Sequence, residues 1–365
     1  MKFPSFGDIL KSEPGLSSGF DYLRLLLASS VFVWHAYVFT HSAQDINALL
    51  ISPIGNLIYA ILPAFFALSG FLIASSLVRC KNVGLFVWLR IVRIFPALAV
   101  VVMLTVLVMG PLVTSVGMRE YFSHKDFFRY FLNAFGLLNL WLPGVFMENP
   151  AKGIVNASMW TIAWEFKSYL LLGALALTPL IRYPAYLWRG FCTAIILGLA
   201  YCIVWRTTEN RLDHFTGPQL MIFFAAGAAL FLYRDRIPYI GSLAVVCAVI
   251  SIWLINHPTW FLASVIPLAY CIAWGGLQNP AKIWVIKKGD YSYSVYLYGG
   301  PIQQLVWQYS ETGREFGWNL LISAIVTLPF AIFSWHVVEK PALRLKKAFS
   351  FTKISQTEIT PAYPS

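Results

Sequence analysis

Charged residues are scarce in this chain of 365 residues, because only 12% are Asp, Glu, Lys or Arg while 58% are hydrophobic. A soluble globular protein carries about 25% charged residues, so the composition excludes that class. Apolar segments of spanning length recur along the chain, and they are continuous rather than alternating, which argues against a β-barrel. The sequence therefore predicts an all-α protein, a polytopic membrane helix bundle.

Cysteine is also scarce, and its spacing follows no pattern. The chain has five cysteines and no Cys-x-x-Cys pair, so neither a disulfide framework nor a zinc site is expected. We predict no metal site, and we assign the cysteines to packing. Residues 1–20 lack the short apolar core of a cleavable signal peptide, so the first span is expected to stay as a signal anchor.

Neither an internal repeat, nor a low-complexity tract, nor a soluble domain is visible in the sequence. We therefore expect one membrane domain over residues 1–345. A short polar cytoplasmic tail over residues 346–365 is expected to be disordered.

Gly, Pro and charged residues divide the apolar sequence into about ten expected spans. A further stretch, 127–146, is apolar but rich in aromatic residues and broken by Pro143-Gly144, so we expect a re-entrant or interfacial helix there. If 127–146 crosses the membrane, the count rises by one. The expected spans are 22–41, 54–78, 94–115, 158–181, 190–206, 217–233, 239–256, 259–277, 292–310 and 317–338.

The net charge of +11 is explained by topology rather than by nucleic-acid binding. With the N-terminus inside, most of the 27 Lys and Arg residues fall in inside segments. The positive-inside rule then places both termini in the cytoplasm. Some of these basic residues also suit an anionic cytoplasmic ligand or lipid headgroups.

Two ionisable residues lie eleven positions apart in the first span, Arg24 and His35. At about 100° and about 1.5 Å per residue they share one helical face and lie about 16 Å apart. Ionisable groups at membrane depth are costly, so they indicate function. Histidine can accept a proton near neutral pH. The alternatives are a snorkelling or ion-paired Arg24 and a hydrogen-bonded structural His35.

Arg90 and Arg93 lie at the cytoplasmic mouth of the third expected span. Arginines at i and i+3 share a helix face. Two guanidinium groups suit a phosphorylated ligand, because each can bond phosphate oxygens in a bidentate manner. The alternative is that they only anchor the span on its cytoplasmic side.

Two further groups of residues suit a polar pocket inside the membrane. Glu165 and Tyr169 lie at i and i+4, about 10 Å inside the outer start of their span on helix rise alone, and an acidic group there requires partners. Glu165 either orients His35, binds an acceptor hydroxyl or forms a structural ion pair. Tyrosines gather at 291–298, where an aromatic belt at the membrane interface is the alternative to a pocket.

These blocks, in this order, resemble the acyltransferase-3 family of integral-membrane acyltransferases over about residues 15–345. One departure is Tyr298, which stands where many relatives have a histidine. The matching residues are Asp21-Tyr22-Leu23-Arg24 with His35, the block Phe65–Leu72 that contains Ser69-Gly70, Arg90 and Arg93 with Phe95-Pro96, Trp160 with Glu165 and Tyr169, Ser292-Tyr293-Ser294 with Tyr296-Leu297, and Glu339-Lys340-Pro341.

The resemblance implies a multi-pass enzyme of the bacterial cytoplasmic (inner) membrane. Such an enzyme transfers an acyl group, usually acetyl, from a cytoplasmic acyl-CoA to a hydroxyl of a cell-surface or exported polysaccharide or glycolipid. Arg24, His35, Arg90 and Arg93 fall on the family's functional arginine and histidine motifs. No permanently bound cofactor is expected, and the expected partners are acyl-CoA, a carbohydrate acceptor and the bilayer.

We therefore assign roles to residues as hypotheses. Arg24, Arg90 and Arg93 bind the phosphates of acyl-CoA. His35 acts as a base or carries the acyl group, with Glu165 as its catalytic partner. The expected substrate contacts are Trp160, Tyr169, Tyr293 and Tyr296.

Two alternatives remain open from the sequence. One is a polytopic transporter or flippase of a glycan or small metabolite, since a helical bundle with buried charge fits that class too. The other is O-acylation of a diffusible product such as an antibiotic.

Overall fold

The computed structural model describes residues 3–12, 17–80, 82–204, 215–257 and 260–345. Within these ranges the regular structure is helical, and one isolated β-bridge joins Ser5 to Pro238. The tail 346–365, for which disorder was predicted, lies outside the described residues.

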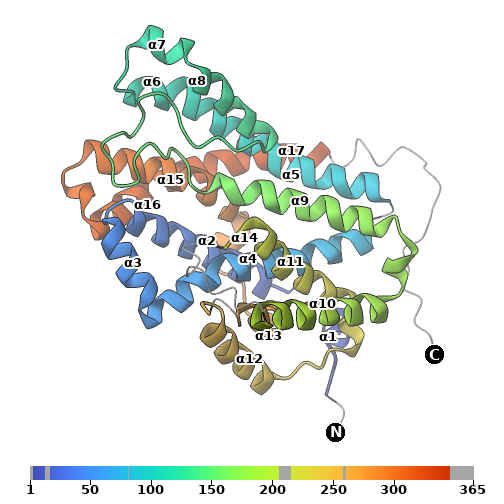
Figure 1. Cartoon of the computed structure of the whole chain (residues 1–365). Coiled ribbons are helices and arrows are strands. Elements are labelled where there is room, and N and C mark those ends of the chain that lie inside the picture. The colour runs from blue at the N-terminus through green and yellow to red at the C-terminus, as the bar shows by residue number, and fades with distance from the viewer. Residues whose placement is uncertain (1–2, 13–16, 81, 205–214, 258–259, 346–365) are drawn as a thin grey trace.

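Every expected span contains a helix, and shorter helices lie between them (Figure 1). The long helices are α2 (Gly19–Val38), α4 (Pro53–Arg79), α5 (Val83–Leu104), α9 (Met159–Ala176), α10 (Pro184–Val204), α11 (Gly217–Leu232), α12 (Gly241–Leu254), α13 (Val265–Gly276), α15 (Ser292–Tyr309) and α16 (Phe316–Phe333). The short ones are α1 (Phe6–Ser12), α3 (Ala43–Ile51), α6 (Gly110–Val113), α7 (Met118–Ser123), α8 (Lys125–Tyr130), α14 (Trp284–Lys288) and α17 (Lys340–Arg344).

Among the described residues, three helical segments are long and apolar enough to cross a membrane: 53–79, 83–113 and 316–344. The second is longer than α5 because a π-helical turn, Thr105–Met109, joins α5 to α6 without a break. Shorter apolar helices, including α11 and α12, accompany these three. The chain is thus an all-helical membrane protein. The count of about ten spans and the cytoplasmic position of both termini stay predictions.

The stretch 127–146 does not form a spanning helix. Its helical part consists of the end of α8 and a 3₁₀ turn, Phe131–Phe135, which ends where Gly136 takes a positive φ of 77°. From there the chain runs as loop until α9 begins at Met159. In Figure 1 the segment with α6, α7 and α8 stands apart from the main bundle.

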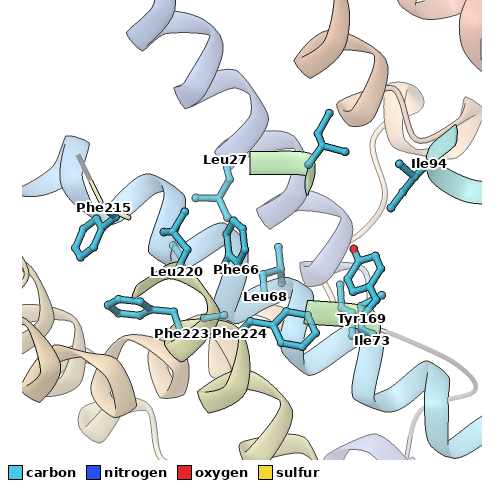
Figure 2. Close-up of a cluster of buried hydrophobic side chains, with 14 of the residues drawn as sticks. Leu27, Phe66, Leu68, Ile73, Ile94, Tyr169, Phe215, Leu220, Phe223 and Phe224 are labelled. Atoms are coloured by element: carbon cyan, nitrogen blue, oxygen red, sulfur yellow. The ribbon is translucent and has the colours of Figure 1, made fainter. Parts of the chain in front are cut away.

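Helices α4 and α11 cross with their backbones in close approach, and two glycines make this possible. A Cβ atom on Gly70 would clash with the carbonyl oxygen of Phe224, and one on Gly227 would clash with the carbonyl oxygen of Ala67. Small residues at membrane helix crossings let the two backbones approach, which gains packing energy where no hydrophobic effect operates. Figure 2 shows buried side chains of this region, among them Phe66 and Leu68.

A methyl group at this crossing should therefore destabilise the fold. Because the clashing atoms belong to backbone, Gly227→Ala should lower the free energy of unfolding by about 1–3 kcal/mol, the usual cost of overpacking. The measurement is the thermal unfolding midpoint of the purified protein in detergent. Gly190→Ala in α10 is the control, because a Cβ there meets nothing within 4 Å. Equal midpoints for the two variants would contradict this account of the crossing.

Candidate active site

Helices α2, α4, α9 and α15 supply residues to two cavities. The first, which we call the arginine cavity, has a volume of about 120 Å³ and is lined by Arg24, Arg90 and Arg93 together with Glu165. The second, the histidine cavity, has a volume of about 500 Å³ and is lined by His35 and Ser158 among other residues. The structure thus brings together the three arginines proposed from the sequence and places His35 apart from them.

The two cavities share Leu62 and Tyr296 as lining residues. On α2, Arg24 faces the first cavity and His35 the second, so the helix face predicted from their spacing runs along both. The predicted substrate contacts divide in the same way. Tyr169 and Tyr293 line the arginine cavity, and Trp160 lines the histidine cavity.

The three arginines of the arginine cavity differ in how fully they are paired. Arg93 forms ion pairs with Asp290 at 2.7 Å and with Glu339 at 3.0 Å, and the Glu339 side chain is only 1% exposed. Arg24 lies farther from its carboxylates, at 3.6 Å from Asp21 and 3.8 Å from Asp290. These pairs make Arg93 the more constrained of the two.

Arg90 has no carboxylate partner among the described residues. One of its terminal nitrogens donates a hydrogen bond to the hydroxyl of Ser76 at 3.1 Å. Its Nε atom is buried and has no hydrogen-bond partner within the described ranges. A buried, unsatisfied donor on a cavity wall is costly, so its presence calls for an explanation such as a ligand. Of the three arginines, Arg90 is therefore the one whose charge is least compensated within the described ranges.

Asp290 lies just before α15 and lines the arginine cavity. Burial alone would raise the pKa of its carboxyl group, but the positive charges of Arg93 and Arg24 hold that pKa below its usual value. Asp290 therefore stays ionised and fixes two guanidinium groups at once.

Glu165 belongs to a compact hydrogen-bond cluster with Ser69 and Tyr169. The hydroxyl groups of Ser69, at 2.9 Å, and of Tyr169 both donate to Glu165 Oε1. The hydroxyl oxygens of Ser69 and Tyr169 also lie 3.2 Å from each other. Ser69, which the sequence analysis named only as part of the block Phe65–Leu72, therefore ties α4 to the acidic group of α9.

His35 has a different partner from the one expected. Its Nδ1 atom lies 3.4 Å from the hydroxyl of Ser158, whereas the hydrogen bonds of Glu165 go to Ser69 and Tyr169. Ser158 is itself positioned by Asn156, whose side-chain oxygen accepts from the Ser158 backbone N–H at 3.1 Å. Asn156 in turn donates to the carbonyl of Leu297 in α15 at 2.8 Å. The structure thus places Ser158, rather than Glu165, beside His35.

Several of these residues were absent from the sequence-based site. Ser158, Asp290 and Glu339 stand inside or beside the motifs that the sequence singled out. For Asp290 and Glu339 the available signal was an acidic residue next to a predicted span, which requires a partner; Ser158 carried no such signal. Their partners lie on other helices, and spacing along one helix cannot identify those.

The arrangement can perform an acyl transfer. A site with free positive charge in one cavity and a proton acceptor in the next separates the binding of an anionic donor from the activation of a hydroxyl. The histidine cavity is also lined by the aromatic residues Trp34, Trp160 and Tyr59 and by Asn47.

Known proteins point to the same chemistry. The chain is 29% identical over 349 residues to a Shigella phage Sf6 protein named O-acetyl transferase, a match that covers 89% of this chain and 95% of that protein. It is 26% identical over 384 residues to nodulation protein 10 of Rhizobium leguminosarum bv. viciae, covering 93% and 97% of the two chains. No solved structure gives a significant match.

The acyltransferase-3 sequence profile, described as an acyltransferase domain, matches residues 17–336. That range contains both cavities and every residue proposed for the site except Glu339. The enzyme assignment therefore replaces the transporter alternative. The chain belongs to the acyltransferase-3 family and is an O-acyltransferase of the membrane.

Proposed function

We propose that the protein transfers acetyl from acetyl-CoA to a hydroxyl of a cell-surface or exported polysaccharide or glycolipid, in the bacterial cytoplasmic membrane. The observation that carries this proposal is the pair of adjoining cavities, one with the arginines and one with His35. The acetyl group is supported by the Sf6 relative, which is named an O-acetyl transferase, and the carbohydrate acceptor is carried over from the sequence resemblance to the acyltransferase-3 family. A diffusible hydroxyl compound is the alternative acceptor.

In this proposal the arginine cavity receives the phosphate end of the donor. Arg90 supplies the free charge, because its guanidinium group has no carboxylate partner among the described residues. Arg24 adds a second, loosely paired guanidinium group. Arg93 is already held by Asp290 and Glu339, so we assign it to shaping the cavity rather than to holding phosphate alone.

The acceptor hydroxyl enters the histidine cavity, where Trp160 and Trp34 offer ring faces to a sugar. His35 takes the hydroxyl proton as the oxygen attacks the thioester carbonyl carbon. A C–O bond forms, the C–S bond breaks, and the proton passes from His35 to the departing CoA sulfur. A route in which His35 first carries the acetyl group uses the same cavities.

Ser158 and Glu165 then have separate roles. If Ser158 accepts a hydrogen bond from Nδ1–H of His35, the opposite ring nitrogen is left free to accept the hydroxyl proton. Glu165 balances the positive charge of the arginine cavity and fixes Tyr169. Glu165 thus supports catalysis from the donor side.

Loss of the base should abolish most of the transfer. His35→Gln keeps most of the side-chain volume but removes the titrating imidazole, so transfer should fall by about 10²–10⁴-fold, the usual contribution of general base catalysis. The measurement is transfer of label from [¹⁴C]acetyl-CoA to the glycan fraction of membranes from the native host, deleted for the gene and expressing the variant.

His41→Gln is the control for this experiment. His41 lines the same cavity, but its Nδ1 atom contacts the Tyr37 carbonyl at 3.1 Å and the Thr40 hydroxyl at 3.0 Å. It should retain activity much closer to that of the unchanged protein. Normal transfer by His35→Gln at an equal level of membrane-inserted protein would contradict the assignment of the base.

Arg90 and Arg93 should respond differently to the same substitution. Arg90→Gln should weaken CoA binding by about tenfold to a hundredfold, the loss expected for charge-assisted hydrogen bonds, with little effect on the fold. Arg93→Gln should reduce the amount of folded protein, because it leaves Glu339 buried without its ion pair, a loss of about 3–5 kcal/mol.

The measurements are calorimetric CoA affinity and the unfolding midpoint in detergent. Arg79→Gln is the control, since Arg79 donates to Ser75 and is not part of the cavity wall. Unchanged CoA affinity in Arg90→Gln would show that Arg90 does not bind CoA and only anchors its span on the cytoplasmic side.

A further inference from the structure

The boundary between the two cavities lies at one level of the bundle. On α4 the lining passes from Ile61, which faces only the histidine cavity, through Leu62, which faces both, to Phe65 in the arginine cavity. On α9 the change falls between Trp160 and Thr161. On α15 it falls at Tyr296, which again faces both. Leu62, Thr161 and Tyr296, one from each of three helices, therefore mark the boundary between the two cavities, and we call these three residues the wall.

A hydrogen bond closes this wall. The hydroxyls of Tyr296 and Thr161 lie 2.5 Å apart, and the Thr161 hydroxyl also lies 3.2 Å from the carbonyl of Ser158, to which it donates. Tyr296 is consequently the donor to Thr161. The ring of Tyr296 also packs against Phe65 at a centroid distance of 6.1 Å. The wall is thus fixed by the same backbone segment that presents Ser158 to His35.

The wall stands in the path that the acyl group has to take. This argument rests on the proposed function, in which the donor is bound by the arginines and the hydroxyl is activated at His35. The thioester carbonyl must reach the histidine cavity while the phosphates stay in the arginine cavity, so the acyl group passes between Leu62 and Tyr296. Packed protein interiors admit few extra atoms without a shift of side chains, so each added methylene has to displace part of the wall.

We infer that Leu62 and Tyr296, held by Thr161, form a constriction that selects acetyl over longer acyl groups. The selectivity comes from size, and it acts on the donor side of the reaction, independently of the sugar. One extra methylene is commonly discriminated by about 10–200-fold in a fitted apolar site. The constriction can therefore explain a preference for acetyl over longer acyl groups without any contact to the CoA nucleotide.

The test compares acetyl-CoA with butyryl-CoA as donors for Leu62→Ala and for a matched control. Ile61→Ala is the control, because Ile61 is the neighbouring half-buried residue of α4 and faces only the histidine cavity. The readout is transfer of ¹⁴C label to the glycan fraction of host membranes that supply the natural acceptor. Leu62→Ala should raise the ratio of butyryl to acetyl transfer by at least about tenfold, and Ile61→Ala should leave it within about twofold.

A second pair of variants tests the hydrogen bond itself. Tyr296→Phe and Thr161→Val each remove one hydroxyl of the same bond with little change in volume. Each should raise the butyryl to acetyl ratio by a similar factor, and the double variant should give no further increase. If the increase in the ratio for the double variant equals the product of the two single increases, the two hydroxyls act separately. That result would contradict the claim that this hydrogen bond holds the wall closed.

The outcomes separate this inference from the proposed function. If the unchanged protein transfers no label from acetyl-CoA, the proposed function fails, and with it the inference. If it transfers acetyl but Leu62→Ala and Ile61→Ala give the same donor ratio, the function stands and the constriction is refuted. A raised ratio in Leu62→Ala alone supports both.

Discussion

The ionic clamp around Arg93 is the interaction on which the rest of the site depends. It joins α5, the loop just before α15 and the helical segment 316–344, since Arg93 bonds to both Asp290 and Glu339. A single buried charge in a membrane bundle is costly, but paired charges with further hydrogen bonds are tolerated. Ser292 and Ser294 supply such bonds, to Asp290 and Glu339 respectively.

From this clamp the remaining geometry follows in two directions. On one side it fixes the start of α15, and hence the position of Tyr296 in the wall between the cavities. On the other side, the clamp neutralises the charge of Arg93 with two carboxylates. Arg90 is left without a carboxylate partner in the described ranges. The site thus contains one arginine paired with two carboxylates and one that we propose to bind the donor, three positions apart on one helix.

The sequence alone was sufficient to predict where helices form and which residues share a face of one helix. Apolar runs bounded by Gly, Pro and charge predicted a helix in each region where a long one lies, although α5 begins at Val83 rather than at the expected position 94. The i, i+3 spacing placed Arg90 and Arg93 together. The contacts of His35 and Glu165 were not accessible in this way. Each depends on a serine from another helix or loop, Ser158 or Ser69, and only the tertiary packing decides which serine reaches which group.

In the proposed reaction, donor and acceptor occupy adjoining cavities, with His35 on the far side of the wall from the arginines. The most direct measurement is an experimental structure of the protein with a non-hydrolysable thioether analogue of acetyl-CoA. We predict phosphate density beside Arg90 and the thioether sulfur at the wall of Leu62 and Tyr296, with the acetyl group directed toward His35. An analogue whose phosphates lie in the histidine cavity, or whose acetyl group points away from His35, would contradict the account.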